Sequence, residues 1–161
     1  MPTVTITKRD LLLTIRDGGS NSKVVLMEDG SLSWDEGTPE AIYMITRGSI
    51  ANGDTRDGDD TPMSLSFNIA VTDHANAAAS TLDGFLRIPP GSWEETNLVS
   101  TLGAGRDMRL DLEVTILGDK RGQADQTLQF PDCKFKVSDA EGDFLMRSVT
   151  ATCKATQPSY I

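Results

Sequence analysis

Few residues in this sequence have the types and the spacing that catalysis requires. His74 is the single histidine, and nucleophilic triads and histidine-ligated zinc sites both need a partnered imidazole. Its neighbours Asp73, Ala75 and Asn76 belong to no Cys-x-x-Cys or His-x-x-x-His pattern. We therefore interpret His74 as a solvated residue at the start of a helix.

The best candidate for an ion site is the acidic stretch NGDTRDGDD, residues 52–60. Hard cations such as Ca²⁺ bind clustered carboxylate oxygens. The EF-hand spacing fails, because Arg56 stands at a ligand position and no Glu stands where a loop counted from Asp54 would end. We interpret this stretch as a solvated acidic loop and predict no metal site.

The other patterns of carboxylates and glycines in the sequence do not match those of a known catalytic or phosphate-binding site. Asp35 and Glu36 are adjacent, as are Glu94 and Glu95, and neighbouring residues on a strand point to opposite faces. Glycosidases need a cleft with aromatic platforms, whereas this chain has two Trp and two Tyr. LGAGRD, residues 102–107, lacks the lysine of a phosphate-binding loop. The sequence predicts a protein that is not an enzyme and uses no cofactor.

Length and charge narrow the class of protein. The 161 residues predict a single domain, 1–161, and the net charge of −9 argues against a nucleic-acid groove. No apolar run reaches the roughly 18 residues of a membrane helix, and the first residues lack the profile of a signal peptide. Two cysteines, Cys133 and Cys153, are expected to be reduced core residues of a chain that folds in the cytoplasm.

Alternation with a period of two is the dominant pattern of the chain. MSLSFNIAVT, residues 63–72, and MRLDLEVTIL, residues 108–117, each predict a long strand with one dry face and one wet face. Further strands are expected at 3–7, 11–16, 23–27, 40–46 and 127–137. The polar positions singled out on the two long strands are Ser64, Ser66, Asn68, Arg109, Asp111 and Glu113.

Turn signals and one helical pattern complete the predicted fold. Asp29-Gly30 predicts a tight hairpin, and the cluster at 139–143 predicts a C-terminal hairpin that packs Phe130, Phe135 and Val149 into the core. Apolar residues at helical spacing predict one helix within residues 74–91, capped by Asp73 or, in a shorter version, by Ser80, and stopped by the Pro-Pro-Gly at 89–91. Residues 91–107 are expected to be irregular. The fold class is thus mainly β: two packed antiparallel sheets with one flanking α-helix and a long inter-strand loop at 47–62.

The wet strand faces admit two interpretations: they are solvated in a monomer, or they line a channel built from several copies. The order of elements bears on this choice. The acidic loop is followed by MSLSFNIAVTD, STLDGFLRI, a Trp93 passage with ETN, GRDMRLDLEVTIL, and finally TLQFPDCKFKVSDAEGDFLMRSVTATCKA. Over roughly residues 40–155 this order resembles the tail tube proteins (major tail proteins) of long-tailed bacteriophages, with Phe144 where related hairpins often carry a proline.

The resemblance implies a structural subunit of a virion tail. In that family, six copies form a ring whose strands join around a channel, rings stack into a tube, and DNA passes through without specific binding. The implied partners are further copies of the chain and the tail terminator, tape measure and distal tail proteins, with no membrane. The long loop would contact the adjacent ring through Ile50, Asp54, Arg56, Asp57, Asp59 and Asp60, and the six polar strand positions are candidates for the channel face.

Three alternatives remain open at this point. The same fold serves the tubes of contractile tails and of type VI secretion. A second class is an independent β-sandwich binding module, such as an adhesin domain. A third is another ring protein of a tail, at its terminator or hub.

The cysteine interpretation generates the first testable prediction. Replacing Cys133 and Cys153 by Ala should lower the free energy of unfolding by at most about 3 kcal/mol, because only packing is lost, and should leave copy–copy assembly intact. Thermal unfolding and electron microscopy of the double variant measure both effects. Loss of assembly when reductant is added to the wild type would overturn the interpretation.

Overall fold

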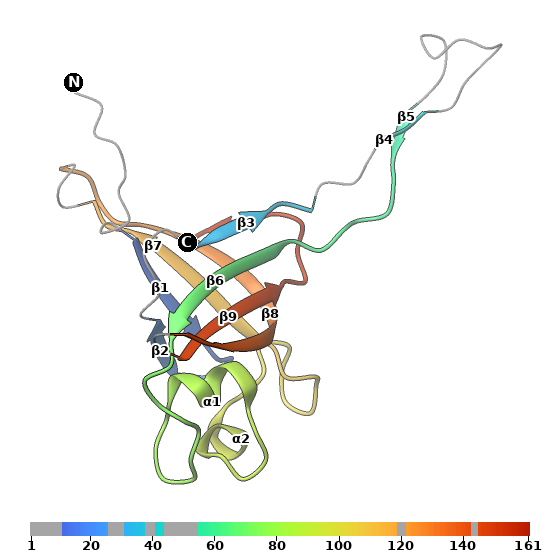
Figure 1. Ribbon diagram of the computed structural model, residues 1–161. Coiled ribbons are helices and arrows are strands. Elements are labelled where there is room, and N and C mark those ends of the chain that lie inside the picture. The colour runs from blue at the N-terminus through green and yellow to red at the C-terminus, as the bar shows by residue number, and fades with distance from the viewer. Residues whose placement is uncertain (1–10, 26–30, 38–40, 44–54, 119–121, 143–144) are drawn as a thin grey trace.

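Alternating apolar residues fold this chain into a strongly curved antiparallel sheet with two short helices at one end (Figure 1). The computed structural model describes residues 11–25, 31–37, 41–43, 55–118, 122–142 and 145–161. Its elements are β1 (Leu11–Arg16), β2 (Ser22–Val25), β3 (Ser33–Asp35), β4 (Ala41–Tyr43), β5 (Thr55–Asp57), β6 (Ser64–Ala70), α1 (Leu82–Arg87), α2 (Trp93–Asn97), β7 (Leu110–Ile116), β8 (Gln126–Glu141), β9 (Leu145–Thr152) and β10 (Ser159–Tyr160).

The main sheet has eight strands, in the order β2-β1-β7-β8-β9-β6-β3, with β10 paired to β8. β8 is 16 residues long; its first part pairs with β7 and its second part with β9. The change of partner falls at Pro131 and Asp132, where Asp132 has a φ of 52° and the β7 register shifts. The two predicted sheets are therefore the two halves of one sheet, joined through β8, and the mainly β class is confirmed.

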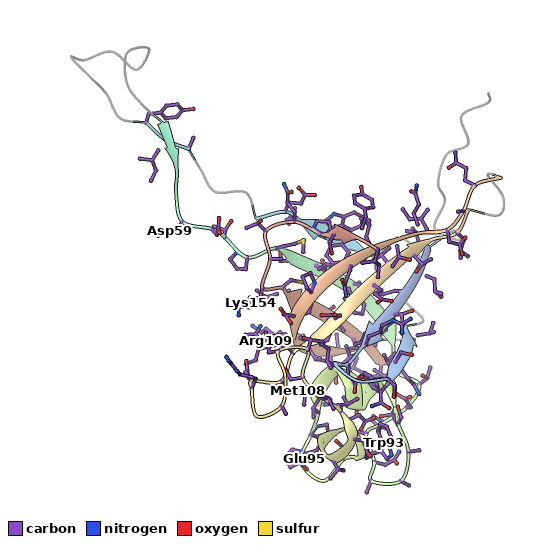
Figure 2. All side chains as sticks on the ribbon, turned by 180° about the vertical axis from the view of Figure 1, so that it is seen from behind. Asp59, Trp93, Glu95, Met108, Arg109 and Lys154 are labelled. Carbon is purple, nitrogen blue, oxygen red and sulfur yellow. The ribbon has the colours of Figure 1, made fainter. Side chains whose placement is uncertain are left out.

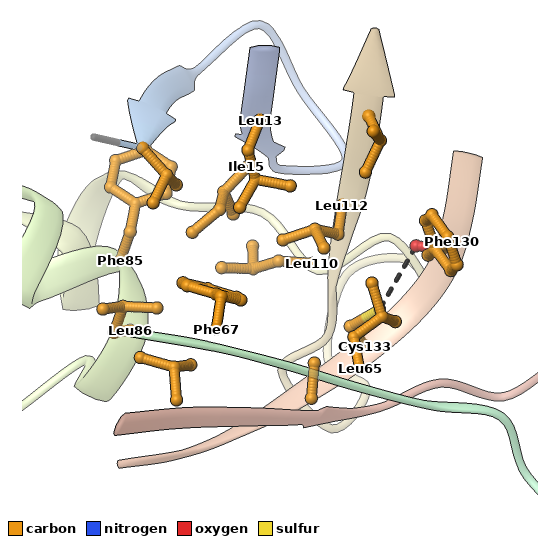
Figure 3. Packing of buried hydrophobic residues seen from close by; sticks show 14 of the residues in the cluster. Leu13, Ile15, Leu65, Phe67, Phe85, Leu86, Leu110, Leu112, Phe130 and Cys133 are labelled. Carbon is orange, nitrogen blue, oxygen red and sulfur yellow. Dashed lines mark hydrogen bonds between the residues drawn. The ribbon is translucent and has the colours of Figure 1, made fainter. Parts of the chain in front are cut away.

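The concave side of this sheet carries the core. β6 contributes Leu65, Phe67 and Ile69, because every second residue of a strand faces the same side. β1 and β7 supply the facing layer, and α1 closes one end (Figure 3). The other buried apolar side chains of this core include Leu13, Ile15, Phe85, Leu86, Leu110, Leu112, Val114, Phe130, Cys133, Val149, Ala151 and Cys153.

Most predicted strands are confirmed, and some boundaries move. The strand expected at 11–16 is β1, and the C-terminal hairpin is β8 and β9, which pair from Lys134↔Thr152 to Glu141↔Leu145. The hairpin predicted at Asp29-Gly30 does not join β2 to β3, because β2 pairs with β1 and β3 pairs with β6 at the other end of the sheet path; Asp29 and Gly30 themselves lie outside the described residues. The strand expected at 3–7 lies outside the described residues.

The shorter of the two predicted helices is the one that forms: α1 begins at Leu82, and its cap is Thr81, whose hydroxyl accepts from the N–H of Gly84 at 3.0 Å. The longer version fails because the Asn76 carboxamide accepts hydrogen bonds from the N–H groups of Ala78 and Ala79, which holds that segment in a turn. A second helix, α2, lies inside the passage expected to be irregular. Ser92 caps this helix, and Glu95 accepts from the N–H of Gly91 at 2.7 Å. The Ser-x-x-Glu spacing of a capping box was the missed signal.

A buried ion-pair cluster attaches α1 to the β8–β9 hairpin. The guanidinium of Arg147, on β9, is 1% exposed and contacts Asp83 of α1 and Asp139 of β8. Arg87 donates two further hydrogen bonds to Asp83, both at 2.8 Å. Burial raises the pKa of Asp83, but the Arg87 pair, the N–H of Ala75 and Arg147 outweigh it and lower this pKa to about 2.

Replacing Asp83 by Asn should remove about 3 kcal/mol of unfolding free energy at neutral pH, because the buried Arg147 loses its buried partner and keeps only the more exposed Asp139. The folded pKa of about 2 lies below the ordinary value of 3.8. The stabilisation from this carboxylate is therefore complete above about pH 4 and is lost as the pH falls through about 2. Urea unfolding at several pH values measures the effect, with the exposed Asp35→Asn as control. A gap between wild type and Asp83→Asn that stays constant down to pH 2 would contradict the assignment.

Candidate assembly interface

A two-stranded arm leaves the body of the protein at the end opposite the helices (Figure 1). We call residues 37–62 the arm; within it β4 and β5 pair antiparallel, from Ala41↔Asp57 to Tyr43↔Thr55, and belong to a sheet of their own. Ile42 and Tyr43 are 41% and 58% exposed. A strand with exposed apolar side chains that covers no core of its own chain is typical of an interaction surface.

The base of the arm is fixed to the body by backbone contacts. The N–H of Gly37 donates to the carbonyl of Thr156 at 2.9 Å, and the N–H of Met63 donates to the carbonyl of Ala155 at 2.8 Å. A Cβ atom on Gly37 would lie 1.8 Å from the carbonyl oxygen of Thr61, so only glycine fits between the two legs of the arm. An open groove of about 510 Å³ beside this base is lined by Asp60, Thr61, Pro62, Lys154, Ala155, Thr156 and Gln157.

The predicted stacking loop is the outer part of this arm. Ile50 and Asp54 lie outside the described residues. Arg56 and Asp57 are in β5, so the expectation of an irregular loop throughout 47–62 is wrong: backbone pairing with β4 orders part of it. Asp59 and Asp60 are exposed on the leg that returns to the body (Figure 2).

Sequence reasoning predicted a strand at 40–46, of which β4 with Ile42 and Tyr43 is the described part, but missed that this strand is the inner leg of an arm. The available signal was the repeated Thr-Pro dipeptide at 38–39 and 61–62. A residue before proline favours extended backbone, and two such dipeptides on either side of a polar stretch indicate two extended legs.

The candidate channel positions on β6 belong to a face of small polar side chains. Ser64, Ser66 and Asn68 alternate with the buried residues of the strand. The register places Thr150 and then Lys136 beside Ser66, and the hydroxyls of Ser33 and Ser66 lie 2.9 Å apart. This outer face of the β3-β6-β9-β8 half is therefore built largely from hydroxyl groups.

The candidate positions on and beside β7 belong to a different face, built from ion pairs. Glu113 is buried and accepts from Arg16 at 2.6 Å, and Arg109 donates to Asp107 at 3.1 Å. Asp111 accepts from the Gln129 side chain and from the N–H of Asp132, both at 2.9 Å. Burial, with nearby Asp132 and Glu113, raises the pKa of Asp111 although these hydrogen bonds oppose the shift.

The structure does not bring the two sets of channel candidates together. β8 and β9 stand between β6 and β7 in the sheet, and the sheet curves around its core. The outer face at β6 and the outer face at β7 therefore point in different directions, so a single channel wall uses one set or the other.

The described residues offer little else with chemical function. They contain no group of three or more His, Cys, Asp and Glu placed to hold a metal ion. They also contain no helix that is long and apolar enough to cross a membrane.

Cys133 and Cys153 are buried free thiols, as predicted, and their mutual hydrogen bond, together with burial, raises the pKa of Cys133. Such a thiol stays protonated and unreactive.

Comparison of the structure with solved structures shows which fold this is. It is similar to a chain of the cryo-EM structure of an extracellular contractile injection system, the PVC sheath/tube terminator in the extended state (TM-score 0.61, 10% identity, 99% of this chain and 96% of that chain). It is also similar to a chain of the PVC sheath-tube complex in the extended state (TM-score 0.58, 10% identity, 99% and 93%). A third similar chain belongs to the six-fold symmetrised baseplate of the anti-feeding prophage (TM-score 0.56, 12% identity, 100% and 96%).

These likenesses extend over nearly the whole length of each chain at very low sequence identity, and they show that the fold is shared. The sequence matches no protein-family model and no curated protein. The chain therefore has a phage-tail-like tube fold.

The close contact at the base of the arm generates a prediction. Gly37→Val should lower the unfolding free energy by about 2 kcal/mol, because the new side chain must displace the Thr61 backbone and disrupt the hydrogen bond to Thr156. Gly19→Ala is the matched control, since its Cβ would meet only the Asp17 side chain, at 3.4 Å. Thermal unfolding of both variants measures the difference. Equal melting temperatures would show that the base is not fixed as described.

Proposed function

We propose that this chain is a structural subunit of a phage-tail-like tube, in which copies form six-membered rings that stack into a hollow conduit. The observation that carries the proposal is the arm: it extends from a body that shares its fold with chains of sheath-tube and baseplate assemblies. None of the described residues fully covers Ile42 and Tyr43 of its inner strand, so a second molecule is the partner that we propose for them. The subunit works inside an assembled tail particle and is neither an enzyme nor dependent on a cofactor.

The ends of the sheet support lateral contact between copies. β2 and β3 are the first and last strands of the sheet path among the described residues, so each has one side without a neighbour. An unpaired strand edge is a template for pairing with another chain, and closing a ring of subunits covers such edges. Two unlike edges on one subunit give the head-to-tail contact from which a ring forms.

The channel of the tube would be lined by the hydroxyl face at Ser64, Ser66 and Asn68. These side chains are small and uncharged, and they stand in rows with the Ser and Thr side chains of β9. On the alternative face, Glu113 is paired with Arg16, and Asp111 accepts hydrogen bonds from Gln129 and the N–H of Asp132. On the hydroxyl face the cations Lys134 and Lys136 are confined to β8, and the side chains of β6 and β9 are uncharged. A polyanion such as DNA is held by cations, whose binding releases its counterions, so it slides past the uncharged part of the wall. DNA passage without specific binding is the corresponding transport role.

A tube terminator is the second candidate function. The similarity to a chain of the sheath/tube terminator structure, at a TM-score of 0.61, favours it. The two roles differ in one physical property. A tube subunit presents complementary surfaces at both ends and polymerises, whereas a terminator ends a tube and remains a single ring. The remaining proteins expected in such a tail, the tape measure and distal tail proteins, would contact either one.

The test is self-assembly of the purified chain, followed by electron microscopy. Wild-type protein should form hollow filaments of uniform width. Replacing residues 50–60 by a short Gly-Ser linker should abolish filaments while far-UV circular dichroism and the melting temperature stay nearly unchanged. Shortening this loop alters the closure entropy by only about 0.6 kcal/mol per halving of its length.

The outcomes separate the candidates. Single rings that never stack, even at high concentration, assign the chain to a terminator. A strictly monomeric wild type contradicts both roles. Full-length tubes from the variant with the shortened loop would show that the arm does not act in stacking.

A further inference from the structure

A groove lies where α1 meets the sheet, between the end of that helix, the segment before β7, and β8. Its volume is about 280 Å³. Its floor is apolar and its margin is charged, which is the usual composition of a site that buries a few side chains of a partner. The floor and walls are formed by Phe85, Leu86, Ile88, Met108, Leu110, Cys133 and Phe135, and the charged margin by Arg87, Asp107 and Lys134.

Ile88 is held in a strained conformation at the wall of this groove. It ends α1 with φ 45° and ψ 59°, in the left-handed region. Glycine or asparagine is usual at such a position, and a β-branched residue there is an outlier. The half-buried side chain packs partly on the core and partly lines the groove. Strain of this kind is typical of functional sites, because a less strained residue would serve the helix end equally well.

The flank around the groove is basic, although the chain as a whole is acidic. The Lys134 side chain is 61% exposed and that of Arg87 is 42% exposed, and Arg109 and Lys136 lie close by in sequence and register. Asp107 contacts Arg109 at 3.1 Å and Lys134 at 3.6 Å, so one carboxylate serves two cations. On a chain of net charge −9, this flank favours an acidic partner.

The arm of the same chain has the complementary properties. Residues 37–62 contain five Asp or Glu and two Arg, and Asp59 and Asp60 are exposed. Ile42 and Tyr43 supply exposed apolar side chains beside them. Figure 2 shows Asp59 on the arm, and Arg109 and Met108 on the same flank but toward the helices that carry Trp93 and Glu95. The arm extends away from its own body, so it does not occupy its own groove.

We propose that the groove between α1 and β8 receives the arm of a second copy of this chain. The inference rests on the proposed stacking of rings and names the surface that accepts the arm. Tyr43, the more exposed of the two apolar residues of β4, packs on the apolar floor, and the carboxylates of the returning leg face Arg87 and Lys134. Because the arm and the groove lie toward opposite ends of the body, each copy contacts the next in the same orientation. A heterologous contact of this kind generates an open stack.

Charge exchange between arm and groove is the first experiment. Lys134→Glu should weaken association between copies at least tenfold in sedimentation velocity at low salt, and Asp60→Lys should do the same. The double variant should return to within about threefold of the wild type, since the two opposite charges are exchanged. Gln123→Glu with Gln126→Glu is the control, because it adds the same negative charge at exposed positions away from the groove and from the edge strands.

Ile88→Asn separates a binding role from a purely structural one. Asparagine tolerates the left-handed conformation, so the melting temperature should stay level or rise while association falls at least tenfold. A lower melting temperature with unchanged association would assign Ile88 to the core alone and overturn its part in the site.

Cross-linking tests the contact independently of tube formation. A chain with Tyr43→Cys is mixed with a chain carrying Met108→Cys, both with Cys133 and Cys153 replaced by Ala, and a short bis-maleimide is added. The expected product is a dimer linked between positions 43 and 108.

The outcomes distinguish this inference from the proposed function. Tubes without the cross-link, with Lys134→Glu behaving like the control, overturn the groove while the tube role stands. Cross-linked dimers that never build rings or tubes support the groove and contradict the tube role. If Lys134→Glu assembles like the wild type but loses binding to a short DNA duplex, the flank binds a polyanion and the inference is wrong.

Discussion

The buried guanidinium of Arg147 is the interaction on which the arrangement of this protein depends. A fully buried cation is costly unless it is paired, and Asp83 and Asp139 are its two partners. One partner is on α1 and the other on β8, so satisfying the charge fixes the helix against the long hairpin. The helix in turn covers the end of the core with Phe85 and Leu86. If α1 were displaced, Arg147 would lose its partner Asp83, and the end of the core covered by Phe85 and Leu86 would be exposed to solvent.

Strands with two unlike faces could be predicted from the sequence because the pattern is local. β1 has the expected boundaries at Leu11 and Arg16, since alternation continues to both ends. Pairing could not be predicted in the same way. The Asp29-Gly30 dipeptide is typical of a tight hairpin turn, yet β3 pairs with β6. In that pairing Trp34 is the register partner of Leu65, and its ring packs edge-on against Phe130. Tertiary contacts of this kind override a favourable turn.

The sites of assembly were harder to predict for a second physical reason. The acidic outer leg of the arm is visible in the sequence as a charged stretch, and its partner leg is predicted as a strand at 40–46, but the pairing of the two legs is recognisable only in the structure. The burial of Arg147 at an inward position of β9 was not predicted from the sequence. A buried cation is recognised by the residues that pair with it in space, and its sequence neighbours do not reveal them. Candidate positions on β6 and β7 were grouped by pattern, whereas curvature of the sheet separates them.

The pairing of β1 with β7 has a consequence for synthesis of the chain on the ribosome. Leu13 pairs with Val114, about one hundred residues later. At roughly 5 to 20 residues per second, β1 waits on the order of 5 to 20 seconds for its partner to be made. During that interval the β1–β2 hairpin has one unpaired edge and an apolar face turned to solvent. Non-local pairing of this kind slows folding, and on a polysome the hairpin meets identical nascent chains before it meets its own β7.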